Sequence, residues 1–144
     1  MMDGLSAAAS VIAVIQVSSQ VFDLCWTYYI NVKDARKDIQ RLRNEITALQ
    51  DVLVNVADLI DDPNSSSLKA LNSISQEGGP VQQCQSELLA LVARLDPGEE
   101  KGRMRQFGIR ALKWPFSSKE VDKVLDSIGR HKSSFTLALA ADQT

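Results

Sequence analysis

The chain has 144 residues, of which 44% are hydrophobic and 6% aromatic, and its 16 Lys and Arg against 18 Asp and Glu give a formal charge of −2. This composition excludes collagen-like and disordered chains and fits one domain rich in helix. The near-neutral total gives no reason to expect nucleic-acid binding. It conceals a segregation, because residues 1–100 carry 7 basic and 14 acidic side chains whereas residues 101–132 carry 9 and 3.

The chain begins with an uncharged segment. Gly4 to Phe22 are 19 residues without a formal charge, and Asp3 is placed to cap a helix. No Lys or Arg precedes Lys33, which argues against a secretory or mitochondrial leader and favours an intracellular protein. Apolar residues gather on one arc at helical spacing, with Ser and Gln opposite. We expect an amphipathic helix over residues 4–30 with an uncharged polar side.

The clearest periodicity predicts a second helix over residues 33–61. Its apolar residues follow an unbroken 3-4-3-4 spacing: Val32, Ala35, Ile39, Leu42, Ile46, Leu49, Leu53, Val56 and Ile60. Such a seam belongs more often inside an intramolecular bundle than in an intermolecular coiled coil. Pro63 ends this helix because it disfavours the helical conformation for Asp62.

Two further helices follow, separated by helix breakers. Ser65 to Ser67 supply caps for a short helix over residues 66–75, which Gly78-Gly79-Pro80 ends. A helix over residues 80–95 repeats the 3-4-3-4 spacing with Val81, Cys84, Leu88, Leu91 and Leu95.

The end of the chain predicts a basic helix over residues 102–113 and a last helix over residues 117–141. Ser117 and Glu120 form a capping box at the start of the last helix, with Phe116 and Val121 as its hydrophobic staple. Lys132 interrupts the apolar seam and is expected to reach the bundle edge. The predicted fold class is therefore all-α: a single domain, residues 1–144, forming a four-helix bundle with additional short connecting helices.

Signals for catalysis are missing from the sequence. His131 is the one histidine, and its basic neighbours predict a solvated helix face rather than a catalytic base. No nucleotide-binding loop, HExxH, EF-hand or CxxC motif occurs. Cys25 and Cys84 are too few for a zinc site and are expected to be reduced thiols in the core. We expect no enzyme activity, catalytic residue, cofactor or metal.

The first helix has two interpretations. Its 19 uncharged residues extend about 28 Å at 1.5 Å per residue, close to the ~30 Å hydrocarbon core of a bilayer. The candidate membrane-insertion residues are Leu5, Val11, Ile12, Val14, Ile15 and Phe22. Alternatively, this helix is simply the innermost helix of the bundle. Both interpretations hold if it is buried at rest and released on activation.

The basic stretch near the end also has alternatives. The candidate lipid-headgroup residues are Arg103, Arg105, Arg110 and Lys113, which can attract anionic membrane lipids. The alternative is a solubilising outer face of a short helix. Nucleic-acid binding through residues 101–113 is a weaker possibility, and we expect no nucleic-acid partner.

Several segments together resemble a known family. Four segments are similar to the HeLo-like N-terminal domain of fungal STAND (NOD-like) receptors. They are Met2–Gln16 at the opening, Val32–Leu49 in the second predicted helix, Leu112-Lys113-Trp114-Pro115-Phe116, and Lys132–Leu139 in the last predicted helix. The resemblance covers essentially the whole chain, and the opening with the Trp-Pro-Phe segment is its most specific part.

The resemblance implies a cell-death execution domain of fungal innate immunity and heterokaryon incompatibility. It implies clustering by a NOD-like receptor or an amyloid-signalling partner, self-association, and permeabilisation of the plasma membrane by a protein that is cytoplasmic at rest. A non-lytic protein-interaction module of the same receptors is the alternative. Because no nucleotide-binding domain or evident amyloid motif follows the last helix, we expect either an excised domain or a stand-alone effector.

Overall fold

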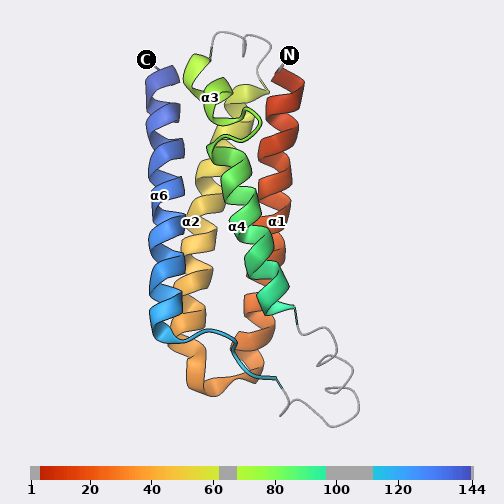
Figure 1. Ribbon diagram of the computed structural model, residues 1–144, viewed down its shortest axis with the longest axis vertical. Coiled ribbons are helices and arrows are strands. Elements are labelled where there is room, and N and C mark those ends of the chain that lie inside the picture. The colour runs from red at the N-terminus through yellow and green to blue at the C-terminus, as the bar shows by residue number, and fades with distance from the viewer. Residues whose placement is uncertain (1–3, 62–67, 97–111, 144) are drawn as a thin grey trace.

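The computed structural model describes residues 4–61, 68–96 and 112–143, with side chains from residue 7 onward. Within these residues the chain forms helices and no strand, which confirms the predicted all-α class. Four long helices run side by side along the long axis of the molecule (Figure 1). The start of the first helix and the end of the last lie at the same end of the bundle.

The helices have the following bounds: α1 Gly4–Asn31, α2 Arg36–Ile60, α3 Lys69–Ile74, α4 Pro80–Leu95 and α6 Ser118–Gln143, with a 3-10 turn at Lys33–Ala35. The helix predicted over residues 80–95 is confirmed at both ends. The one predicted over residues 33–61 begins three residues later, because the 3-10 turn occupies its start. Leu112 and Lys113 are not helical, so the prediction of a helix ending at residue 113 is wrong there, and residues 102–111 lie outside the described part.

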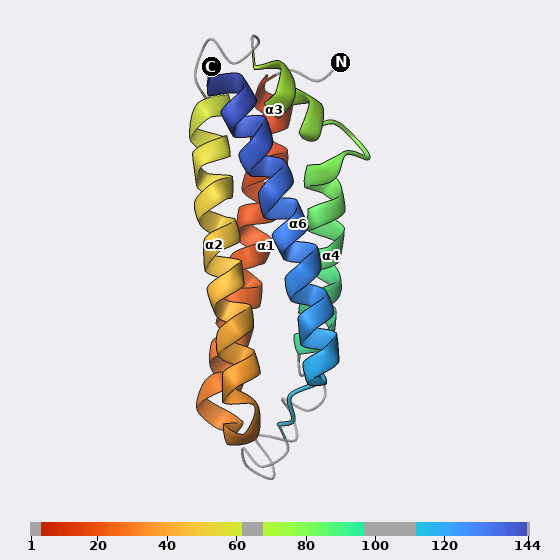
Figure 2. The same cartoon turned by 90° about the vertical axis from the view of Figure 1, so that its left-hand side faces the viewer.

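The long helices surround one core, with α1 packed between α2 and α4 (Figures 1 and 2). Helix α6 packs against α2 on one side, and the last part of α6 packs against the short helix α3. By contrast, α4 and α6 make far fewer contacts with each other than α1 makes with its two neighbours. The seam between α4 and α6 is thus the least closed side of the bundle.

The heptad pattern identified the core correctly. All seven predicted positions of α2 from Ile39 to Ile60 are at most 1% exposed, and all five positions of α4 are buried. Val32 and Ala35, which precede α2, are only partly buried. A strict 3-4 spacing keeps one stripe of the helix facing its neighbours, and burial of that stripe drives assembly of the bundle.

Two helix starts are stabilised by side chains. The Ser117 hydroxyl accepts a hydrogen bond from the Glu120 amide at 3.2 Å, and the Glu120 carboxylate accepts one from the Ser117 amide at 3.1 Å, which confirms the capping box. For α3, the residues expected to supply caps lie outside the described part. Two amides of its first turn, at Ala70 and Leu71, instead donate to the Asp142 carboxylate of α6. A residue more than seventy positions away therefore caps α3.

An aromatic cluster closes the opposite end of the bundle. The Trp114 ring packs edge-on against Tyr28 and Phe116, each at 5.3 Å between centroids. The Tyr28 hydroxyl donates a 2.7 Å hydrogen bond to the Leu95 carbonyl at the end of α4. These contacts join the end of α1, the end of α4 and the segment leading into α6.

Candidate functional site

The candidate membrane-active segment, α1, is built into the centre of the fold. Val11, Val14, Val21 and Cys25 are completely buried, and their side chains belong to one core with those of α2 and α4. Ser18, which interrupts this stripe, is also buried and donates a hydrogen bond to the Ile15 carbonyl at 2.7 Å. That bond satisfies the hydroxyl within its own helix, so burial leaves no unpaired polar group.

The six predicted insertion residues do not lie on one face. Val11 and Val14 are buried, Ile15 and Phe22 are partly buried, and Ile12 is 47% exposed. The Leu5 side chain lies outside the described part. Position 12 is 200° from position 14 around a helix, which places Ile12 on the solvent side. Residues expected to act together thus divide into a core set and a surface set.

The outer side of α1 carries no formal charge from Ala7 to Phe22. Gln16, Ser19 and Gln20 are exposed there, and the Ser19 hydroxyl accepts a 2.8 Å hydrogen bond from the Gln50 amide of α2. The stretch Ala7–Asn31 is long and apolar enough to cross a bilayer, with a mean hydropathy of 1.5 in its most apolar window. Because 39% of that window is buried, α1 also has the character of a core helix.

A cluster of aromatic rings and arginines, which the sequence patterns did not predict, lies at the end of α1. The Arg43 guanidinium of α2 lies over the rings of Phe22, Trp26 and Tyr29, at 4.6, 4.8 and 5.6 Å from their centroids. The Arg36 guanidinium lies 5.3 Å from the Tyr29 ring, which stacks on Trp26 at 5.7 Å. The i, i+4, i+7 spacing of the three aromatic residues is the sequence signal that could have found this cluster.

The predicted headgroup residues are mostly outside the described part. Arg103, Arg105 and Arg110 fall within residues 97–111, and Lys113 is exposed just before Trp114. The structure thus places one of the four, Lys113, on the surface.

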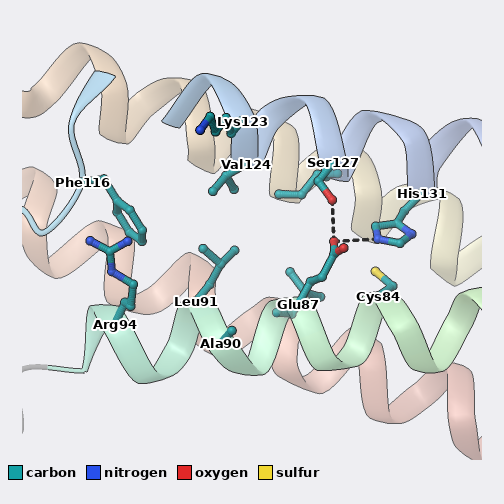
Figure 3. A pocket seen from close by; sticks show the side chains of 12 residues that line it. Cys84, Glu87, Ala90, Leu91, Arg94, Phe116, Lys123, Val124, Ser127 and His131 are labelled. Atoms are coloured by element: carbon teal, nitrogen blue, oxygen red, sulfur yellow. Dashed lines mark hydrogen bonds and ion pairs between the residues drawn. The ribbon is translucent and has the colours of Figure 1, made fainter. Parts of the chain in front are cut away.

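A groove of about 300 Å³ lies along the seam between α4 and α6 (Figure 3). Its walls are mainly apolar, with Leu91 of α4 and Val124 of α6 pointing toward each other. The Glu87 carboxylate joins the two helices by accepting a 2.6 Å hydrogen bond from the Ser127 hydroxyl and lying 2.7 Å from Nε2 of His131. The expectation that His131 occupies a solvated face is wrong, because its side chain is 12% exposed and stacks on Phe135.

This polar trio does not have the geometry of a catalytic triad. In a triad the histidine lies between the nucleophile and the carboxylate and removes the nucleophile's proton. Here the carboxylate of Glu87 lies between Ser127 and His131. The nearby Cys84 thiol is no alternative nucleophile, because burial, and secondarily the charge of Glu87, raises its pKa to about 12. The trio thus fastens α4 to α6.

Both cysteines are buried and free. Burial also raises the pKa of Cys25 to about 12, against a smaller opposing effect of the Arg43 charge. Both thiols are therefore protonated at neutral pH, and within the described ranges no group of three His, Cys, Asp or Glu side chains is arranged to hold a metal ion.

Acid should loosen the seam between α4 and α6. Partial burial opposes ionisation of Glu87, but the hydrogen bonds from Ser127 and His131, with the charges of His131 and Arg130, outweigh it and hold the pKa below its usual value. The resulting stabilisation is complete above the unfolded-state pKa and is lost as the pH falls through the folded-state pKa.

We therefore expect Glu87→Gln to lower the urea midpoint of unfolding at neutral pH and to have a diminishing effect in acid. Glu77→Gln, at an exposed carboxylate between α3 and α4, is the matched control and should change little. A deficit of Glu87→Gln that stays constant down to acid pH would show that the ionised carboxylate does not fasten the seam.

The fold defines a small α-helical bundle domain whose first helix is buried on its apolar side and carries no formal charge over residues 4–22. The sequence belongs to a family described as the N-terminal region of pigment biosynthesis cluster protein PigL, which matches residues 2–143. Neither a curated protein nor a solved structure matches the chain.

Proposed function

We propose that this domain is a membrane-permeabilising cell-death execution domain of a fungal NOD-like receptor system, activated by oligomerisation and release of α1. The observation that carries the proposal is the position of α1: a helix of bilayer length near the start of the chain, whose residues 4–22 carry no formal charge, held in the bundle by its apolar face. The resemblance to HeLo-like domains supports the cell-death role, whereas the description of the family that matches the chain names a pigment biosynthesis cluster protein.

Burial energies explain why such a helix stays closed in a single copy. The buried face of α1 includes Val11, Val14, Val17, Val21 and Tyr28. At about 1.5–3 kcal/mol for each large apolar side chain, their burial stabilises the closed bundle by about 7–15 kcal/mol. The apolar residues of the charge-free segment gain only about 2–5 kcal/mol by entering a bilayer. Insertion therefore needs further contacts, which neighbouring copies supply when a receptor or an amyloid-signalling partner clusters them.

In this proposal the protein is cytoplasmic at rest and reaches the plasma membrane on activation. Anionic lipids would be attracted by Arg103, Arg105, Arg110 and Lys113 through their positive charges. Released α1 helices would present the side that carries Val11, Val14, Ile15 and Phe22 to lipid and their Ser and Gln side chains to each other or to water, with Ile12 at the boundary between the two sides.

A non-lytic interaction module is the second candidate. The observation that favours it is the complete burial of Val11, Val14, Val21 and Cys25, which is what a permanent core helix requires. Under this alternative α1 never leaves, and lipid vesicles leave its protection against proteases unchanged even when the protein is clustered.

The exposed residue Ile12 gives the sharpest test of insertion. Ile12→Asp puts a charge where the side chain is 47% exposed, so the closed bundle should keep its stability. In the bilayer, replacing Ile by Asp costs about 3–4 kcal/mol per helix. We expect dye release from liposomes by protein clustered through a C-terminal tag to fall by at least ~100-fold, since 1.4 kcal/mol corresponds to a factor of ten.

Leu89→Asp is the matched control, because Leu89 of α4 is also 47% exposed and lies outside α1. It should leave dye release unchanged. If wild-type protein releases no dye when clustered, or if Ile12→Asp releases as much as Leu89→Asp, the membrane mechanism is wrong.

A further inference from the structure

The outer surface at the end of α1 combines exposed apolar groups with arginines. We call Trp26, Tyr29 and Ile30 of α1, with Arg36 and Arg43 of α2, the aromatic patch. Trp26 is 47% and Ile30 50% exposed, and they lie one helical turn apart. Trp26, Tyr29 and Arg43 are held together by the ring and guanidinium contacts described above, so the patch is preformed.

The arginines of the patch lack the acidic partners that other arginines have. Arg41 is paired with Asp38 and Asp122, and Arg94 with Glu120. Arg36 and Arg43 form no salt bridge with any carboxylate in the described residues, and the buried Nε of Arg43 has no hydrogen-bond partner there. Among the described residues, Arg36 donates only to the Tyr29 carbonyl, at 3.1 Å, and Arg43 only to the Gln40 side chain, at 3.2 Å. Both cations retain donors for an anion.

Charge around the patch favours an anionic occupant. Lys33 and Lys37, exposed beside Arg36 in the chain, offset the exposed carboxylates nearest in sequence, Asp23 and Asp34, so the positive charges of Arg36 and Arg43 remain in excess. Trp and Tyr rings prefer the headgroup region of a bilayer, because one edge is apolar and the other forms hydrogen bonds. A guanidinium group pairs with phosphate in a bidentate manner. One surface therefore offers both groups that a phospholipid interface requires.

We propose that the aromatic patch docks the closed bundle on an anionic phospholipid surface before α1 is released. The inference rests on the proposed membrane target but not on insertion of α1. Trp26 and Ile30 enter the headgroup boundary while Arg36 and Arg43 contact lipid phosphates. The patch follows directly on the uncharged segment that ends at Phe22. Docking therefore places the C-terminal end of this segment at the membrane interface, where the same end remains after the segment inserts.

Tryptophan fluorescence tests the docking directly. The chain has two tryptophans, and Trp114→Phe leaves Trp26 as the single reporter. With unclustered protein, we expect vesicles of phosphatidylcholine and phosphatidylserine to shift the Trp26 emission to the blue and brominated lipid to quench it, without dye release. Removing one positive charge by Arg36→Gln should weaken vesicle partitioning by about fivefold, since a charge near an anionic surface contributes ~1 kcal/mol. Trp26→Ala, measured by co-sedimentation in the wild-type background, should weaken it as well.

Two control variants match these changes elsewhere on the surface. Lys69→Gln removes an exposed charge from α3, at the other end of the bundle, and Leu89→Ala removes an apolar side chain with the same exposure as Trp26. Both should bind vesicles like the wild type. If they weaken binding as much as Trp26→Ala and Arg36→Gln, or if Trp26 emission does not move, the docking surface is wrong. A lipid-free dimer that Trp26→Ala disrupts would identify a second copy as the occupant and also overturn it.

The docking surface and the proposed permeabilising function can be disproved independently of each other. Vesicle binding that depends on Trp26, with no dye release on clustering, supports the docking surface and removes the proposed function. Dye release with equal binding of wild type and Trp26→Ala supports the proposed function and removes the docking surface.

Discussion

Covalent crosslinking of α1 to α2 is expected to abolish dye release from liposomes by the clustered protein. In Ser19→Cys/Gln50→Cys, a short bifunctional maleimide should join the two side chains, because the native pair is exposed and hydrogen-bonded at 2.8 Å across the α1–α2 contact. The joined helix cannot leave the bundle, so insertion is blocked while the fold is retained. The native thiols should not compete, because Cys25 and Cys84 are buried and protonated.

The matched control ties α2 to α6, two helices that need not separate from each other when α1 leaves the bundle. Arg41 of α2 and Asp122 of α6 are also exposed and 2.6 Å apart, so Arg41→Cys/Asp122→Cys accepts the same reagent between α2 and α6. We expect this protein to retain dye release after crosslinking, and both unreacted variants to behave like the wild type. Full release from a protein whose α1–α2 crosslink is complete by mass spectrometry would contradict the release of α1.

Val14→Glu is expected to unfold the domain or lower its free energy of unfolding by about 3 kcal/mol or more. Val14 is completely buried in the core, so the carboxylate would lose its hydration without gaining a partner. Domains of this size have a total stability of about 5–15 kcal/mol, so the loss is a large part of it. Urea unfolding followed by helical circular dichroism measures the change.

Gln16→Glu is the control, because it adds the same charge to the exposed side of the same helix. It should alter stability by at most ~0.5 kcal/mol. Equal stability of the two variants would show that α1 does not pack as described. Val14→Glu does not distinguish insertion from a permanent core helix, because both require Val14 to be buried in the closed state. Loss of dye release in this variant would follow from unfolding alone, which is why Ile12→Asp is the informative change.

Local signals were sufficient for the frame of the bundle. The 3-4 spacing selected the buried residues of α2 from Ile39 to Ile60, and the pair Ser117 and Glu120 located the start of α6. Lys132 was expected to reach the edge of the bundle, and its ammonium group lies 2.6 Å from the Glu45 carboxylate. The stripe and the capping box arise from residues that follow one another within a single helix, so periodicity and capping chemistry identify them, whereas the Glu45 partner of Lys132 lies on another helix.

Contacts between distant segments decided the rest. Asp142 caps α3, Glu87 contacts His131 in the seam between α4 and α6, and Arg43 packs on the aromatic rings of α1. In each of these contacts the two partners are far apart in sequence. Periodicity shows which residues share a helix face but not which neighbour covers it.

The first helix shows this division most clearly. The sequence by itself determined that residues 4–22 form an uncharged helix long enough to span a bilayer. Only the tertiary structure decided that Val14 is enclosed while Ile12 and Trp26 face outward. The physical reason is that α1 also carries apolar residues outside its main apolar arc, at Ile12, Trp26 and Ile30, so the packing of α2 and α4 sets the limits of the buried side.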